Sequence, residues 1–187
     1  MALKATVFRA EVTIADMDRA YYGRHALTLA RHPSETDERM MVRLLAWILN
    51  ADDALVFGAG LGSDDAPALG LAQPDGTLDH WIEVGLPEPK RLRQAAGRAR
   101  RLTVYSYGGS KASLWWARQR EELARIPRPV SVIELAPEET MALVTLVGRS
   151  MRLTATIQDS QISITDGDDR MVAVNPRTLD PASQEVT

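Results

Sequence analysis

The sequence predicts an α/β fold in which a mixed β-sheet is flanked by helices and followed by a C-terminal β-hairpin or meander. Two observations carry this prediction. Residues 78–135 show strand, helix, strand, helix and strand patterns in turn, and such βαβαβ units pair their strands in parallel through right-handed crossovers. On both sides of this unit, alternating apolar residues separated by turn signals predict hairpins, which makes the sheet mixed.

The N-terminal part of the chain predicts a hairpin followed by a helix. Residues 3–15 alternate and are rich in β-branched side chains, as strands are, and residues 22–31 are expected to return as a second strand. A helix is predicted from Ser34 to about Asn50. Ser34 is the expected N-cap of this helix, and Asp37 is placed to complete a capping box.

The remaining elements follow from the same periodicities and from the Gly and Pro residues that punctuate them. Strands are expected at residues 54–58, 68–72, 78–84, 102–107, 129–135, 151–158, 161–166 and 171–174. Helices are expected at residues 87–101, 110–126 and 137–150. We therefore predict one domain over residues 1–175, followed by a polar C-terminal tail over residues 176–187 that frays.

The composition excludes several classes of protein. The 187 residues, of which 45% are hydrophobic, are enough to bury a core and exclude wholesale disorder. The absence of cysteine excludes disulfide-stapled folds, Cys-ligated metal sites and thiol catalysis. No apolar run has the length of a signal peptide or a membrane span, so we expect a cytoplasmic protein with no membrane partner. None of these features sets the oligomeric state.

The charges are unevenly distributed along the chain. Residues 90–128 hold eleven Lys or Arg residues against two Glu, a local charge of +9, whereas the rest of the chain carries −12. Such a basic segment is typical of a surface that meets a polyanion such as nucleic acid. Two other interpretations remain: the charges cover solvated faces of surface helices, or the two signs form halves of a self-associating interface.

One carboxylate falls on the apolar side of the first predicted helix. On a helical wheel, Glu38 lies between Leu45 and Leu49, where burial is costly unless the carboxylate has a partner or a metal ion. The opposite face is predicted to be polar and holds Glu35, Arg39, Arg43 and Ala46. The alternative is that Glu38 stays open to water in the first turn or pairs with a core arginine.

A second carboxylate lies near the end of the strand predicted at residues 78–84. Glu83 interrupts an apolar run at the carboxyl end of this strand, where open α/β sheets place their ligand sites. The following helix begins with basic residues, and its Lys90 and Gln94 share a face because they are four residues apart. Carboxylates that hold Mg²⁺ beside a cation would suit phosphodiester hydrolysis.

Several blocks of the sequence resemble the YaeQ family. They are Ala2-Leu-Lys-Ala-Thr, Leu27-Thr-Leu-Ala-Arg-His-Pro-Ser-Glu-Thr, Glu38-Arg-Met-Met, Trp81-Ile-Glu-Val-Gly, Tyr105-Ser-Tyr and residues 151–159. The resemblance covers residues 1–175. It implies a relative of the PD-(D/E)XK nuclease superfamily, with a restriction-endonuclease-like core of mixed β-sheet between helices.

The resemblance also implies a set of metal ligands. Glu38 matches the acidic residue of the first core helix, and Glu83 matches the acid of the D/E-x-K element. The first acid of the pattern is expected near Pro67, where this sequence has alanine on both sides, so Asp65 is the substitute and Asp79 a poorer one. With oxygen ligands alone, the expected cofactor is Mg²⁺ or Mn²⁺.

The cation of the motif must come from elsewhere in the sequence. The position of the motif lysine holds Gly85, so the resemblance implies that Lys90, Arg91 or Arg93 supplies the charge, with Lys90 as the first choice and Gln94 as its companion. The expected contacts to nucleic acid are the basic residues Arg91, Arg93, Arg98, Arg101 and Lys111.

Two functions follow as hypotheses. The first is a divalent-metal-dependent phosphodiesterase that acts on nucleic acid with a degenerate motif, formed by Glu38, Asp65, Glu83 and a migrated Lys90. It requires Glu38 and Glu83 to face one cleft, and a Glu83 held by an internal arginine would contradict it. The second is a catalytically inactive module that keeps the fold and the basic surface and binds nucleic acid or a protein partner.

Overall fold

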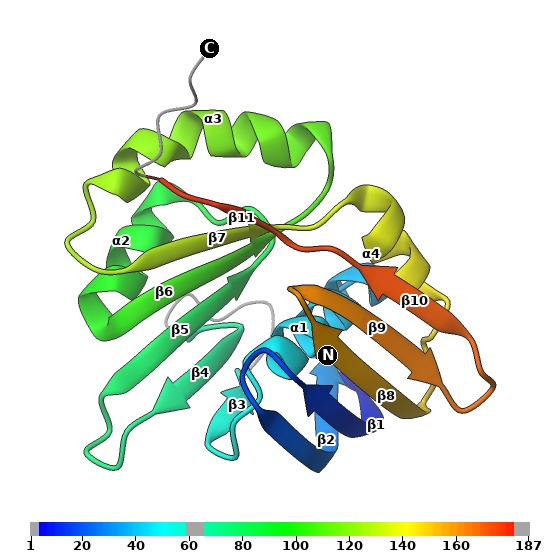
Figure 1. The fold of residues 1–187 in the computed structure, drawn as a ribbon. Helices are drawn as coiled ribbons and strands as arrows, with labels where there is room; N and C mark the ends of the chain where they lie inside the picture. The colour runs from blue at the N-terminus through cyan, green and yellow to red at the C-terminus, as the bar shows by residue number, and fades with distance from the viewer. Residues whose placement is uncertain (1–3, 59–65, 182–187) are drawn as a thin grey trace.

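The computed structural model describes residues 4–58 and 66–181 and shows a mixed α/β fold built on two mixed β-sheets (Figure 1). Sheet A has the strand order β10-β9-β8-β1-β2, and sheet B has the order β11-β7-β6-β5-β4-β3. The strands of sheet A are β1 (Thr6–Asp16), β2 (Tyr21–Arg31), β8 (Ser150–Gln158), β9 (Gln161–Asp166) and β10 (Met171–Val174). The strands of sheet B are β3 (Leu55–Phe57), β4 (Leu69–Ala72), β5 (Leu78–Val84), β6 (Ala99–Ser106), β7 (Val130–Glu134) and β11 (Arg177–Leu179).

Sheet A pairs the first two strands of the chain with strands from residues 150–174. β1 forms the expected antiparallel hairpin with β2, with Thr6 opposite Arg31, and it pairs in parallel with β8, with Arg9 opposite Ser150. The predicted C-terminal meander is present as β8, β9 and β10, which pair antiparallel. Burial alternates along β1, as expected for a strand with one face on the core and the other in water.

Sheet B contains the predicted βαβαβ unit. β5 pairs in parallel with β6, and β6 with β7, as the alternation of strands and helices predicts. The crossovers are formed by α2 (Pro89–Arg98) and α3 (Ser110–Ala124). Antiparallel β4 and β3 extend one edge of this sheet, and antiparallel β11 extends the other.

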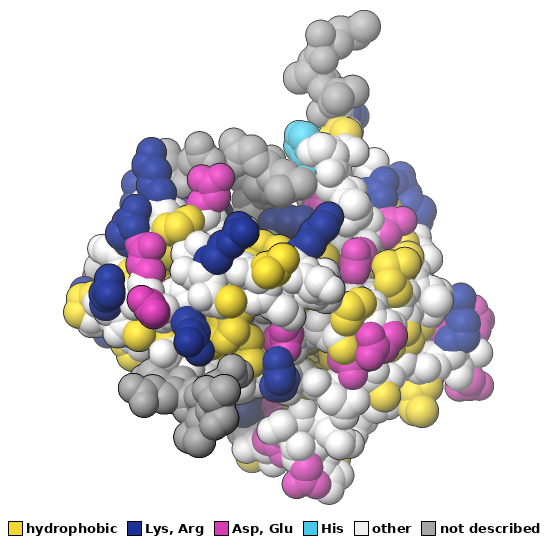
Figure 2. All heavy atoms as spheres, turned by 90° about the horizontal axis from the view of Figure 1, so that it is seen from above, with side chains coloured by type: hydrophobic (Ala, Val, Ile, Leu, Met, Phe, Trp, Pro, Cys, Tyr) yellow, Lys and Arg dark blue, Asp and Glu magenta, His cyan; other side chains and the backbone are white. Residues whose placement is uncertain are grey.

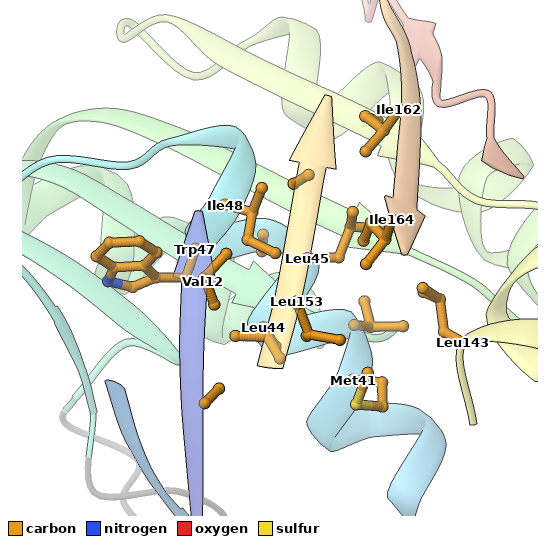
Figure 3. Close-up of a cluster of buried hydrophobic side chains, with 14 of the residues drawn as sticks. Val12, Met41, Leu44, Leu45, Trp47, Ile48, Leu143, Leu153, Ile162 and Ile164 are labelled. Atoms are coloured by element: carbon orange, nitrogen blue, oxygen red, sulfur yellow. The ribbon is translucent and has the colours of Figure 1, made fainter. Parts of the chain in front are cut away.

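Helix α1 (Asp37–Leu49) is buried between the two sheets. Every residue from Met40 to Ile48 is buried, and the main core cluster joins α1 to strands of both sheets. In Figure 3, Leu44 and Leu45 of α1 lie among side chains of β1, β8 and β9, including Val12 and Leu153. A helix that is packed on all sides in this way needs apolar or paired side chains around its whole circumference.

The other helices pack on two sides of the molecule. α2 lies on the face of sheet B that turns away from α1, where Leu92 and Trp81 belong to a second core cluster. α3 packs on the same cluster through buried Leu123 and partly buried Trp115 and Trp116. α4 (Pro137–Val144) packs against α1 and β10 and contributes Leu143 to the main core cluster.

Four expectations need correction. The strands form two sheets, because β1 pairs with β8 and not with the βαβαβ unit. Thr36 and not Ser34 caps α1, accepting a hydrogen bond from the backbone N–H of Arg39 at 3.1 Å. The face of α1 predicted to be polar is buried. The C-terminal tail does not fray from its start, because residues 177–179 form β11 against β7.

Candidate functional site

Glu83 lies near the carboxyl end of β5, as expected, and its side chain points toward α2. Trp81 packs in the second core cluster with α2, whereas Ile82 packs in the main cluster with α1. Because side chains alternate across a strand, Glu83 shares the α2 side with Trp81. The residue is 3% exposed, and its Oε1 accepts a hydrogen bond from the indole Nε1 of Trp81.

The main partner of Glu83 is Arg91. The Nε of Arg91 donates to Oε1 of Glu83 at 2.9 Å, and its Nη2 lies 2.9 Å from the same oxygen. Nη2 also donates to the backbone carbonyl of Ala66 at 2.8 Å, and the guanidinium lies over the Trp81 ring, 5.9 Å from its centroid. Arg91 therefore holds the carboxylate of Glu83 and ties β5, α2 and the segment before β4 together.

The local sequence places Arg91 for this contact. Gly85, at a φ of 105°, ends β5, and Pro89 then occupies the first turn of α2, where its missing N–H costs nothing. The chain thus reverses within four residues, which brings the first turn of α2 back over the end of β5. From the sequence, Arg91 is expected to replace the motif lysine or to contact nucleic acid. The structure shows instead that Arg91 is the internal partner of Glu83.

Glu38 lies on a different surface. It is half-buried in the first turn of α1, and its Oε1 accepts a hydrogen bond from Thr140 Oγ1 of α4 at 2.6 Å. Tyr107, just beyond β6, feels its charge: burial raises the pKa of Tyr107 to about 12, Arg39 opposes the rise, and Glu38 and Glu35 add to it. Thr140 is a partner of Glu38 that no sequence pattern indicated, and Tyr107 is marked in the sequence only as part of the Tyr105-Ser-Tyr block.

The ion pairs of α1 are internal. Glu35 accepts from Nε of Arg43 at 2.7 Å, from its Nη2 at 2.8 Å and from Nη1 of Arg39 at 2.7 Å. Arg43 is fully buried, and burial lowers the pKa of its guanidinium while Glu35 opposes that change. These residues were expected on the polar face, and Glu35 and Arg43 instead pair inside the molecule, where Arg43 also donates to the carbonyl of Ala30 on β2.

The structure does not show the expected contact between Glu38 and Glu83. Glu83 faces α2, whereas Glu38 lies on α1, which packs on the other face of sheet B, and each has its own donor. Asp65 lies outside the described residues. Within residues 4–58 and 66–181, no group of three or more His, Asp or Glu side chains is arranged to hold a metal ion.

The described residues therefore do not fit the Mg²⁺ or Mn²⁺ ion that the resemblance implies. A guanidinium already lies 2.9 Å from the Glu83 oxygen, so a second cation at that carboxylate would meet direct charge repulsion. Lys90 is exposed at the start of α2, and Gln94 is half-buried one turn later.

The remaining basic candidates lie on or near α2, β6 and α3, and several have acidic partners. Arg93 pairs with Glu122 of α3, and Arg101 lies 3.2 Å from Asp79. Arg98 and Lys111 are exposed. Most of these basic side chains are thus exposed, and Arg93 and Arg101 are compensated locally by carboxylates.

His80 is a buried titratable residue that the sequence did not mark as functional. Its Nε2 lies 2.8 Å from Thr103 Oγ1 on β6, and the side chain is 4% exposed. Burial lowers the pKa of His80 to about 4, helped by Arg101 and opposed by Asp79. His80 is therefore neutral at physiological pH and acts as a hydrogen-bonding core residue.

None of the helices in the described part of the chain is both long and apolar enough to cross a membrane.

Comparison with known proteins agrees with the fold. The YaeQ protein family matches residues 1–175. The chain is 43% identical to "Uncharacterized protein YaeQ" of Salmonella typhi and 42% identical to that of Escherichia coli (strain K12), in each case over 89% of this chain and 91% of the relative.

Two crystal structures have the same architecture. YaeQ from Xanthomonas axonopodis pv. citri is 45% identical, with a TM-score of 0.90 over 94% of this chain and 98% of that one. YaeQ from Pseudomonas syringae is 31% identical, with a TM-score of 0.88 over 94% and 96% of the two chains. The chain therefore belongs to the YaeQ family.

Proposed function

We propose that this protein binds nucleic acid through the exposed side of α3 and does not cleave it through Glu38 and Glu83. The observation that carries the binding half of the proposal is the outer face of α3. Lys111, Leu114 and Arg118 are spaced three and four residues apart, so they share one face of the helix, and all three are exposed.

This face combines positive charge with apolar area. In Figure 2, which looks down on the part of the molecule that carries α3, dark blue Lys and Arg side chains lie with yellow hydrophobic side chains between them. Leu114 is 58% exposed. In the described part of the chain, no carboxylate pairs with Lys111 or Arg118. Phosphates attract such unpaired cations, and exposed apolar groups can contact sugars and bases.

The basic residues of this face differ from the neighbouring arginines in how they are paired. Arg93 and Arg101 have acidic partners, and Arg91 is used inside the fold. Lys111 and Arg118 have no such partner in the described part of the chain and lie on a helix with few buried residues. Neither ion pairing nor packing therefore explains why these two positions are basic. The resemblance of the family to PD-(D/E)XK nucleases, with a restriction-endonuclease-like core, supports nucleic acid as the polyanion.

The second half of the proposal rests on the Glu83–Arg91 pair. A carboxylate that serves a metal ion must offer its lone pairs to that ion, whereas Oε1 of Glu83 receives donors from Trp81 and Arg91. The alternative remains a metal-dependent phosphodiesterase, and the experiment below decides between the two.

Binding can be tested by fluorescence anisotropy with labelled single-stranded and double-stranded oligonucleotides over a range of NaCl concentrations. Each phosphate contact contributes about 0.7–0.9 to the slope of log K against log salt, so the Lys111→Ala/Arg118→Ala variant should reduce the slope by about 1.4–1.8. The control Arg24→Ala/Arg152→Ala removes the same charge from exposed positions on sheet A and should leave the slope unchanged. An equal effect of both variants would refute a specific α3 surface.

Cleavage is tested with the same oligonucleotides and added Mg²⁺ or Mn²⁺. The proposal expects the wild type and Glu83→Gln to leave them intact. Metal-dependent cleavage by the wild type that disappears in Glu83→Gln would establish the phosphodiesterase and overturn the second half of the proposal.

A further inference from the structure

A hollow of about 720 Å³ lies between α2 and the C-terminal end of α3. Its apolar lining includes Gly97, Ile126 and Pro127, and its charged lining is Arg93, Arg125 and Arg128 with one carboxylate, Glu122. The volume is within the range of small-molecule sites, which typically combine an apolar floor with a few polar groups. The hollow lies away from Glu38 and Glu83 and from the outer face of α3.

Gly97 has no structural reason to be glycine. It lies within α2 and its φ is not in the left-handed region, so another residue could adopt the same backbone. A Cβ at this position would meet no atom within 4 Å. Gly97 lines the hollow at the last turn of α2, so a larger side chain at this position has open space to extend into.

The charge around the hollow is positive. Arg93 is paired with Glu122, but Arg125 lies 3.9 Å from Glu121 in a pair whose side chains are both more than three-quarters exposed. Such an exposed pair contributes little and yields readily to a stronger anion. Arg128 is exposed and has no acidic partner in the described part of the chain. The guanidiniums of Arg125 and Arg128 are thus both available to bind an anion at the rim of the hollow.

We propose that this hollow binds a nucleoside phosphate, with the base on the apolar floor and the phosphate on Arg125 and Arg128. The planar guanidinium donates two parallel hydrogen bonds to phosphate oxygens, and its face stacks on aromatic rings, so arginine suits both parts of such a ligand. The nucleoside phosphate is either free or one unit of a single strand, and in the second case the inference rests on the proposed nucleic-acid binding.

The variant that tests this proposal is Gly97→Leu, which fills the hollow without backbone strain. Its melting temperature should equal or exceed that of the wild type, since leucine is a better helix former than glycine. If it is lower, Gly97→Ala replaces it, with a smaller expected effect. Ala173→Leu adds similar bulk at an exposed position of β10 and serves as the control.

Two probes separate the sources of the ligand: AMP, measured by calorimetry, and a single-stranded 12-mer of deoxyadenylate, measured by anisotropy. We expect Gly97→Leu to weaken at least one of them tenfold or more, with Ala173→Leu unchanged. Loss for AMP identifies a free nucleotide, and loss for the 12-mer identifies a strand.

The outcome that overturns the inference is equal affinity of the wild type and Gly97→Leu for both probes, or no binding of either. The failure of the proposed function looks different. If the 12-mer does not bind, while AMP binds to the wild type and not to Gly97→Leu, the α3 surface is refuted and the nucleotide site in the hollow is supported. If Lys111→Ala/Arg118→Ala weakens binding of the 12-mer and Gly97→Leu changes the binding of neither probe, the α3 surface is supported and the nucleotide site is refuted.

Discussion

Replacing Glu83 with alanine is predicted to destabilise the protein by about 3 kcal/mol. The change removes the acceptor of the Trp81 indole N–H and the ion-pair partner of Arg91. An unsatisfied buried donor costs about 1–3 kcal/mol, and breaking a buried ion pair costs about 3–5 kcal/mol. The Arg91 side chain is 24% exposed, so water recovers part of its loss, and we take the lower end of the ion-pair range, about 3 kcal/mol, as the cost of the whole change.

The measurement is urea unfolding followed by circular dichroism. With a slope of about 2 kcal/mol per molar urea, a loss of about 3 kcal/mol lowers the midpoint by about 1.5 M. The control Glu121→Ala removes an exposed carboxylate 3.9 Å from Arg125 and should cost less than about 0.5 kcal/mol. A Glu83→Ala midpoint equal to or above that of the wild type would refute the Glu83–Arg91 pair, because carboxylates held ready for a ligand lower stability and their removal raises it.

Three further predictions use the same urea assay. The pKa of His80 is about 4 in the folded protein against 6.5 in a free side chain, so the unfolded state binds the proton first and stability falls as pH drops from about 6.5 to 4. This contribution is about 2 kcal/mol at pH 5 and should be missing in His80→Gln; equal acid sensitivity of both proteins would contradict it. Glu35→Ala should cost about 3–5 kcal/mol by leaving Arg43 buried without its carboxylate, and a cost below 1 kcal/mol would show that water reaches Arg43. Leu45→Ala should cost about 2–5 kcal/mol because the side chain is 1% exposed between the sheets, and a smaller loss would mean that the sheets close over the cavity.

The order of elements could be predicted because it depends on local patterns. The parallel β5-β6-β7 unit followed from alternating strands and helices, and the meander at 151–174 followed from its period and turns. The division into two sheets could not be predicted, because it depends on pairing of β1 with β8 across more than a hundred residues. Periodicity shows that a strand has an apolar face but not which strand lies beside it.

The candidate site was predicted in part. Glu83 was correctly placed at the carboxyl end of β5, since a carboxylate in an apolar run is visible in the sequence. Its partner was not predicted, because the direction in which Arg91 points depends on the turn at Gly85 and on the packing of α2. Likewise, the helical wheel assigned Glu35 and Arg43 to solvent because it assumes one buried face, whereas α1 is buried by two sheets.

The parallel pairing of β1 with β8 also sets the order in which the chain can fold. Residues 6–31 pair with each other locally, yet the strand that completes their sheet on the other side of β1 begins at Ser150. Until that strand emerges from the ribosome, one side of α1 lacks its apolar cover and the free edge of β1 lacks a hydrogen-bonding partner. Contacts of such long sequence separation slow folding, and exposed strand edges favour aggregation. Chains that end before residue 150 therefore keep both the edge of β1 and part of the apolar surface of α1 uncovered.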